Sequence, residues 1–181
     1  MMKRIIETKH QIESGRPKLN LFLQNKSSLT PRATPVLFVH GATYPSSVTF
    51  DYPINGVSWL DWMAKEGFDV WSIDLLGYGR SDRPAEMQSD PNLHAPLVDT
   101  NEAVLDVKRA IKYISKHRRH NKIDLIGYSW GSAICGQIST EMPDSIRRLT
   151  LSGALWLLDQ SPPINASSKS ASVKIEEASS S

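Results

Sequence analysis

The chain contains the pentapeptide Gly127-Tyr128-Ser129-Trp130-Gly131, which has the pattern G-x-S-x-G. It follows a short apolar strand pattern at 123–126 and precedes a helical pattern at 130–142. A strand that turns sharply into a helix forces its central residue into a strained conformation and leaves room only for small residues two positions away. We therefore predict that Ser129 projects from the turn as a nucleophile, with Gly127 and Gly131 making the turn sterically allowed. An incidental turn is the alternative, because glycine and serine are common residues.

The backbone around this turn predicts a site for negative charge. The first N–H groups of a helix have no partner within it, so the N–H of Trp130 can bind a developing oxyanion. A second donor is expected from His40-Gly41-Ala42-Thr43, which directly follows the apolar run at 36–39. A tight loop there can aim the N–H of Ala42 at the same oxygen, while His40 is expected to brace the loop backbone rather than transfer protons. Losing one of two such donors typically costs about 10²- to 10³-fold in rate.

A third motif runs from Asp74 to Pro84 and contains Gly77-Tyr78-Gly79. Two closely spaced glycines could indicate a dinucleotide-binding loop. That interpretation fails, because no third glycine opens a helix and Pro84 follows soon after. The glycines instead suit a tight loop that leaves the carboxyl end of a strand.

Strand-like and helix-like patterns alternate along the chain. Strands are predicted at 5–12, 19–24, 36–39, 68–74, 123–126 and 146–152. Helices are predicted at 58–66, from Asp99 onward, and at 130–142. This alternation predicts an α/β protein with a mostly parallel sheet and helices on both faces.

Composition limits the function classes. The chain has 181 residues, of which 40% are hydrophobic and 22% are charged, values typical of one soluble globular domain. The single cysteine, Cys135, excludes an internal disulfide framework and a Cys-rich zinc site, and we expect it to be a packed core thiol. The net charge of +2 is too small to indicate a nucleic-acid partner. No apolar run is long enough to span a bilayer and no secretory signal is evident, so a cytoplasmic location is expected.

Together, the loop at His40-Gly41, the loop from Asp74 to Ser81 and the elbow at 127–131 resemble the α/β-hydrolase fold superfamily over residues 5–156. The resemblance implies Ser129 as nucleophile, the N–H groups of Ala42 and Trp130 as oxyanion hole, and an ester or related acyl substrate. It implies no metal and no organic cofactor. Branches of the superfamily that carry aspartate at the elbow are disfavoured by the serine.

The resemblance also implies an acid and a histidine that follow the nucleophile in the chain. All five histidines precede Ser129, so the triad histidine has no matching position. The residues just after the strand at 146–152 include no carboxylate, so the triad acid has no matching position there either. Asp159 is a weak candidate for the acid. Of the histidines, His94 could approach the pocket, whereas His117 and His120 are expected at the opposite edge of the sheet.

The domain organisation follows from these gaps. We expect residues 1–160 to form a C-terminally truncated hydrolase core that lacks the last two strands, and the serine-rich residues 161–181 to be disordered. The strand at 146–152 would then be an exposed edge that invites self-association. The alternative to a serine hydrolase is therefore a non-catalytic remnant or interaction module that uses this edge.

Overall fold

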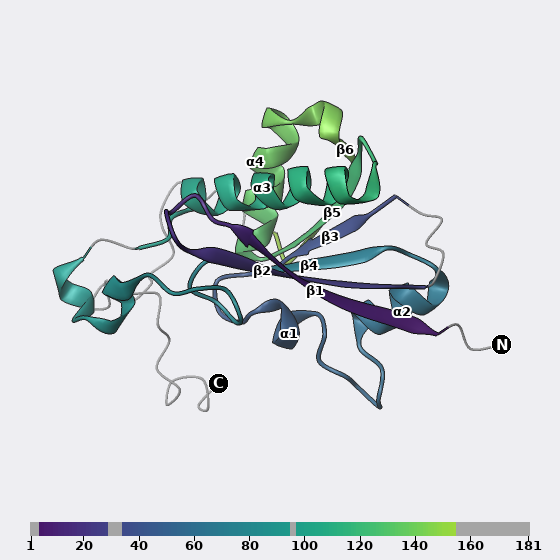
Figure 1. Ribbon diagram of the computed structural model, residues 1–181, viewed down its shortest axis with the longest axis horizontal. Helices are drawn as coiled ribbons and strands as arrows, with labels where there is room; N and C mark the ends of the chain where they lie inside the picture. The colour runs from purple at the N-terminus through teal and green to yellow at the C-terminus, as the bar shows by residue number, and fades with distance from the viewer. Residues whose placement is uncertain (1–3, 29–33, 95–96, 155–181) are drawn as a thin grey trace.

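The computed structural model describes residues 4–28, 34–94 and 97–154 (Figure 1). They form a six-stranded sheet in the order β1-β2-β4-β3-β5-β6. The strands are β1 (Ile5–Glu13), β2 (Asn20–Ser28), β3 (Val36–Val39), β4 (Val70–Asp74), β5 (Ile123–Tyr128) and β6 (Ile146–Ser152). The α-helices are α1 (Ser46–Thr49), α2 (Trp59–Glu66), α3 (Thr100–Arg118) and α4 (Trp130–Glu141). Three 3₁₀ helices complete the structure: η1 (Ala85–Gln88), η2 (Pro91–Leu93) and η3 (Pro143–Ser145).

The sheet is mostly parallel, as predicted. β1 pairs antiparallel with β2, and β2 antiparallel with β4, whereas β4, β3, β5 and β6 run parallel to one another. After β3 the chain moves to β4 on one side, and it then crosses to β5 on the other side of β3. The carboxyl ends of β3 and β5 flank such a reversal of direction, which is where open α/β sheets bind their ligands.

Helices cover both faces of the sheet (Figure 1). α3 and α4 lie on one face, and α1 and α2 lie on the other. The apolar stripe of α3 faces the sheet, and its members are all buried: Val104, Val107, Ile111 and Ile114. Cys135 of α4 is fully buried in the same core, as predicted, and burial raises the pKa of its thiol to about 12.

Local signals set the helix ends. Ser58 accepts from the N–H of Asp61 and begins α2 in a capping box, and Gly67 ends that helix with φ 99°. Asp99 accepts from the N–H of Glu102 at 2.8 Å and begins α3. These caps satisfy N–H groups that the helices leave without partners.

β2 is longer than predicted because buried polar side chains extend it beyond residue 24. Asn25 donates to Asp69 at 2.8 Å, and the ammonium group of Lys26 lies 2.6 Å from Asp51 and 2.7 Å from Asp61. A polar run normally predicts the end of a buried strand. Here each polar group has a partner, so burial is tolerated.

Two further predictions concern exposed residues. A tryptophan in an amphipathic helix predicts a core residue, but Trp59 is 43% exposed and meets the rings of Phe38 and Phe50 in edge-to-face pairs. Within the described residues β6 pairs only with β5, and its Leu149 and Leu151 are 38% and 44% exposed.

Asp159 and the segment 161–181 lie outside the described residues. In the part of the chain that the structure describes, no helix has the length and apolar character needed to cross a membrane.

Candidate active site

The turn from β5 into α4 has the strained backbone that the pentapeptide predicts. Ser129 immediately precedes α4 and has φ 53° and ψ −119°, a backbone conformation that residues other than glycine rarely adopt. Two contacts hold the turn to the end of β6: the N–H of Ser129 donates to the carbonyl of Ser152 at 2.9 Å, and the hydroxyl of Ser132 donates to the same carbonyl at 3.1 Å. Strain that is maintained by surrounding contacts is typical of functional positions.

The two glycines of the pentapeptide are required by close backbone contacts. A Cβ atom on Gly127 would lie 2.3 Å from the carbonyl oxygen of Gly131. A Cβ atom on Gly131 would lie 2.2 Å from the carbonyl oxygen of Val39 and 2.7 Å from that of His40. The elbow therefore packs directly against the end of β3, and this contact brings the two predicted motifs together.

Gly41 lies against the predicted nucleophile. A Cβ atom on Gly41 would be 2.9 Å from the Cβ of Ser129 and 3.4 Å from its Oγ. The N–H of Ala42, the residue after Gly41, and the N–H of Trp130, the residue after Ser129, donate no hydrogen bond to another group of the described residues. Two free donors beside a serine hydroxyl can stabilise a tetrahedral intermediate that bears negative oxygen.

His40 has the bracing position that the sequence predicts. It is fully buried, its Nε2 accepts from the N–H of Leu75 at 3.0 Å, and its Nδ1 donates to the carbonyl of Gly41 at 2.6 Å. These partners require the neutral ring with its proton on Nδ1. The carbonyl of Gly41 belongs to the peptide unit that also carries the N–H of Ala42, so His40 fixes the direction of that donor.

Sequence reasoning missed the part that the loop after β4 plays. The buried carboxylate of Asp74 accepts from the N–H groups of Ser46 at 2.9 Å and Arg80 at 3.0 Å, and so joins this loop to the start of α1. The hydroxyl of Tyr78 donates to the carbonyl of Ala42 at 2.6 Å. The only signal in the sequence was the spacing of Gly77 and Gly79, which identified a tight loop and not its partner.

Burial of His40 has a consequence for the effect of pH on stability. Burial lowers the pKa of His40 from its ordinary value of 6.5, so the folded state favours the neutral ring. The unfolded chain then takes up a proton more readily, and the free energy of unfolding is expected to fall as the pH falls below about 6.5. Urea unfolding at a series of pH values measures this slope.

His10 provides the control for that measurement. Its pKa is also lowered, chiefly by burial, so it contributes to the slope with the same sign. The slope should persist in part in His10→Gln. A slope that vanishes in His10→Gln would contradict the assignment to His40.

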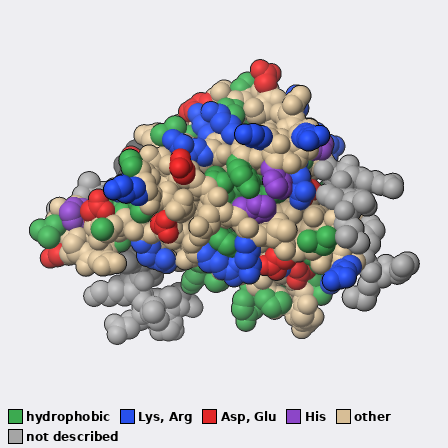
Figure 2. Space-filling model, viewed as in Figure 1, with side chains coloured by type: hydrophobic (Ala, Val, Ile, Leu, Met, Phe, Trp, Pro, Cys, Tyr) green, Lys and Arg blue, Asp and Glu red, His purple; other side chains and the backbone are tan. Residues whose placement is uncertain are grey.

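The structure does not bring a histidine base to Ser129 within the described residues. The Nε2 of His94 bonds to the hydroxyl of Ser89 at 2.8 Å, in the segment around η1 and η2 that projects from the body of the protein (Figure 1). His10 belongs to β1 and His117 to the last turn of α3, and the centroids of their rings are 5.2 Å apart. Histidine side chains gather between these two elements on the face that Figure 2 shows.

Three aromatic residues of the candidate site differ in their surroundings: Trp130 has a hydrogen-bond partner, and two tyrosines are exposed. The indole N–H of Trp130 donates to the hydroxyl of Thr100 at 3.0 Å, which ties the start of α4 to the start of α3. Tyr44 and Tyr128 are 53% and 44% exposed. The side chain of Trp130 therefore has a structural partner at the start of α3.

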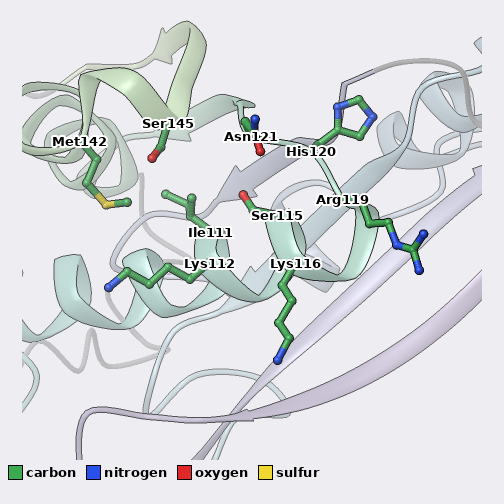
Figure 3. A pocket seen from close by; sticks show the side chains of 9 residues that line it. All are labelled: Ile111, Lys112, Ser115, Lys116, Arg119, His120, Asn121, Met142 and Ser145. Carbon is green, nitrogen blue, oxygen red and sulfur yellow. The ribbon is translucent and has the colours of Figure 1, made fainter.

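A surface pocket lies near the amino ends of the strands β5 and β6, whereas Ser129 follows the carboxyl end of β5 (Figure 3). Its lining residues come from the second half of α3 and from the segments that lead into β5 and β6: Ile111, Lys112, Ser115, Lys116, Arg119, His120, Asn121, Met142 and Ser145. These segments adjoin the amino ends of the strands, whereas Ser129 follows a carboxyl end. The ammonium groups of Lys112 and Lys116 point away from the space between Ser115, Asn121 and Ser145, so the basic side chains do not converge on one anion (Figure 3).

Comparisons with known proteins support one family. Residues 34–171 match a family model described as the alpha/beta hydrolase fold. A probable lipase of Schizosaccharomyces pombe is 27% identical over 126 residues, which cover 62% of this chain and 25% of the lipase. A 2-hydroxymuconate semialdehyde hydrolase of Pseudomonas sp. is 28% identical over 120 residues, which cover 63% of this chain and 38% of that enzyme.

Solved structures show the same architecture. The thioesterase domain from the curacin biosynthetic pathway aligns with a TM-score of 0.62 at 19% identity, covering 86% of this chain and 49% of that domain. A 2-hydroxy-6-oxo-6-phenylhexa-2,4-dienoate hydrolase from Rhodococcus sp. strain RHA1 aligns with a TM-score of 0.60 at 20% identity, covering 88% of this chain and 51% of that enzyme. The chain thus spans about half of each solved structure and less than half of the curated relatives. The match to the family model covers most of the sequence, and the chain belongs to the α/β-hydrolase fold family.

Proposed function

We propose that the chain is a serine hydrolase that acts on an ester or related acyl substrate, with Ser129 as its nucleophile. The observation that carries the proposal is the strained backbone of Ser129 at the start of α4, with Gly41 packed against its side chain. The N–H groups of Ala42 and Trp130 would hold the oxyanion. The distant relatives named as a lipase and as a hydrolase support the same broad class of reaction.

The chemistry would proceed in two steps. The hydroxyl oxygen of Ser129 attacks the carbonyl carbon, the oxyanion forms between the two N–H groups, and the ester C–O bond then breaks. The alcohol leaves with a proton, and an acyl group remains on Ser129. Water then cleaves this acyl-serine to release the acid and restore the hydroxyl.

An unassisted serine hydroxyl is a poor nucleophile at neutral pH. No histidine follows Ser129 in the sequence, and none of the described histidines bonds to it. Imidazole in solution can supply the general base in an experiment, although a dissolved base lacks the advantage of being held in place.

Acetyl transfer from p-nitrophenyl acetate tests the proposal. The purified chain is incubated with the ester and imidazole, and peptide mass mapping then locates any acetyl group. Acetylation at Ser129 that exceeds that of Ser132 and Ser152 supports the proposal. Labelling that is spread over surface serines and lysines, with none enriched at Ser129, would overturn it.

A second candidate is an interaction module that pairs through β6. The observation that favours it is the free edge of β6 within the described residues, with Leu149 and Leu151 partly exposed. Unpaired strands readily add a strand from another chain. Sedimentation over a range of concentrations tests this second candidate. Self-association through β6 predicts a dimer, and Leu151→Lys is expected to weaken that dimer.

A further inference from the structure

Tyr78 lies on the loop after β4, far along the sequence from the predicted oxyanion donor, but it contacts the same loop. Its hydroxyl donates to the carbonyl oxygen of Ala42 at 2.6 Å. Its ring lies 4.9 Å from the ring of His40, measured between centroids, at an interplanar angle of 58°. Neither the motif analysis nor the proposed reaction assigns a role to this tyrosine.

The contacts of Tyr78 and His40 hold two consecutive peptide units. His40 donates to the carbonyl of Gly41, and Tyr78 donates to the carbonyl of Ala42. In a trans peptide the C=O and N–H groups point in opposite directions. Fixing the carbonyl of Gly41 therefore fixes the N–H of Ala42, and fixing the next carbonyl prevents rotation about the bonds on either side of the Ala42 Cα atom.

We propose that Tyr78 is a positioning residue for the oxyanion hole, which holds the backbone of Ala42 so that its N–H faces the oxygen of the substrate beside Ser129. The inference rests on the proposed function and deepens it. A donor that is already oriented costs no reorganisation when negative charge develops, and this preorganisation is the main contribution of an oxyanion hole.

The protonation state of the contacts supports this role. Burial raises the pKa of the Tyr78 hydroxyl, so the hydroxyl keeps its proton and remains a donor at neutral pH. Burial lowers the pKa of His40, which keeps that ring neutral. Both donors are thus present in the pH range in which a serine hydrolase would work.

Tyr78→Phe is the variant that separates positioning from packing. Phenylalanine keeps the ring against His40 and removes only the hydroxyl. We expect the maximal rate of Ser129 acetylation by p-nitrophenyl acetate, with imidazole present, to fall about tenfold, less than for the loss of a whole oxyanion donor. The ester concentration at half-maximal rate should stay the same, because the lost contact acts on charge that exists only in the transition state.

Tyr113→Phe is the matched control. The hydroxyl of Tyr113 also has a hydrogen-bond partner, His10 at 3.0 Å, but it lies away from the elbow. This variant should acetylate at the rate of the unmodified chain. An equal loss in both variants, or a normal maximal rate in Tyr78→Phe, would overturn the inference.

A second measurement tests Tyr78 without any reaction. The ¹⁵N order parameter of the Ala42 amide should be near the rigid value of about 0.85 in the unmodified chain, and should fall in Tyr78→Phe but not in Tyr113→Phe. An unchanged order parameter in Tyr78→Phe would contradict the positioning role. If the unmodified chain shows no acetylation at Ser129 while the order parameter falls as expected, the proposed function fails and the support of Ala42 by Tyr78 stands.

Discussion

Replacing Ser129 with alanine is expected to lower imidazole-assisted cleavage of p-nitrophenyl acetate by about a hundredfold. The variant lacks the oxygen that would attack the ester, while the proposed oxyanion donors, the N–H groups of Ala42 and Trp130, are unchanged. The expected loss is well below the roughly 10⁶-fold seen when a complete catalytic triad loses its serine, because dissolved imidazole is not held against the hydroxyl. Release of p-nitrophenolate at a series of imidazole concentrations measures the effect.

Imidazole itself cleaves the ester, so its rate without protein is subtracted. Ser139→Ala controls for the loss of a hydroxyl from α4, because Ser139 lies farther along that helix and its hydroxyl donates to the carbonyl of Gly136 at 2.7 Å. Equal rates in the unmodified chain and in Ser129→Ala would mean that the elbow retains its shape without reacting. That result would favour the interaction module.

Replacing Gly131 with alanine is expected to lower the free energy of unfolding by about 3 kcal/mol or more. The new methyl group would lie 2.2 Å from the carbonyl oxygen of Val39 and 2.7 Å from that of His40. Both atoms belong to the backbone at the end of β3, so neither can move away without disturbing the sheet. Chemical unfolding followed by circular dichroism measures the change.

Gly136 is the matched control because it lies in the same helix and has open space where a Cβ would be. Gly136→Ala is expected to stabilise the protein by about 0.5 to 1 kcal/mol, since alanine loses less backbone entropy than glycine in a helix. Similar destabilisation by both substitutions would show that helix propensity, and not the contact with β3, dominates at residue 131.

The sequence alone predicts most elements of the fold because the residues that set them are close in the chain. The apolar run at 36–39 forms β3 within its predicted bounds, and the strand at 146–152 forms β6 in the same way. Asp99 caps α3 through a neighbour three residues away. By contrast, the length of β2 depends on Lys26 and its distant partner Asp61, and no local pattern reports such a contact.

The same division applies to the candidate site. The pentapeptide around Ser129 is a local motif, so its strained turn and its required glycines are readable from the sequence. The contact between Gly41 and Ser129 joins segments that are far apart in the chain, and the family resemblance predicts that the two belong together without giving their packing. The hydroxyl of Tyr78 on the carbonyl of Ala42 has no signal in the sequence, because one backbone carbonyl is like any other until the chain folds.

Sequence patterns alone predict all six strands, the helices α2, α3 and α4, the strained serine between β5 and α4, and the placement of every histidine before that serine. These follow from spacing and from residue types, which act over a few positions. The groups that surround that serine, by contrast, depend on how the sheet folds as a whole. The crossover that places β3 beside β5 brings His40, Gly41 and Ala42 to the elbow, and β4, on the other side of β3, brings Tyr78 to the same loop. Such contacts are fixed by the packing of the sheet as a whole, and pairing across many residues cannot be read from any one segment.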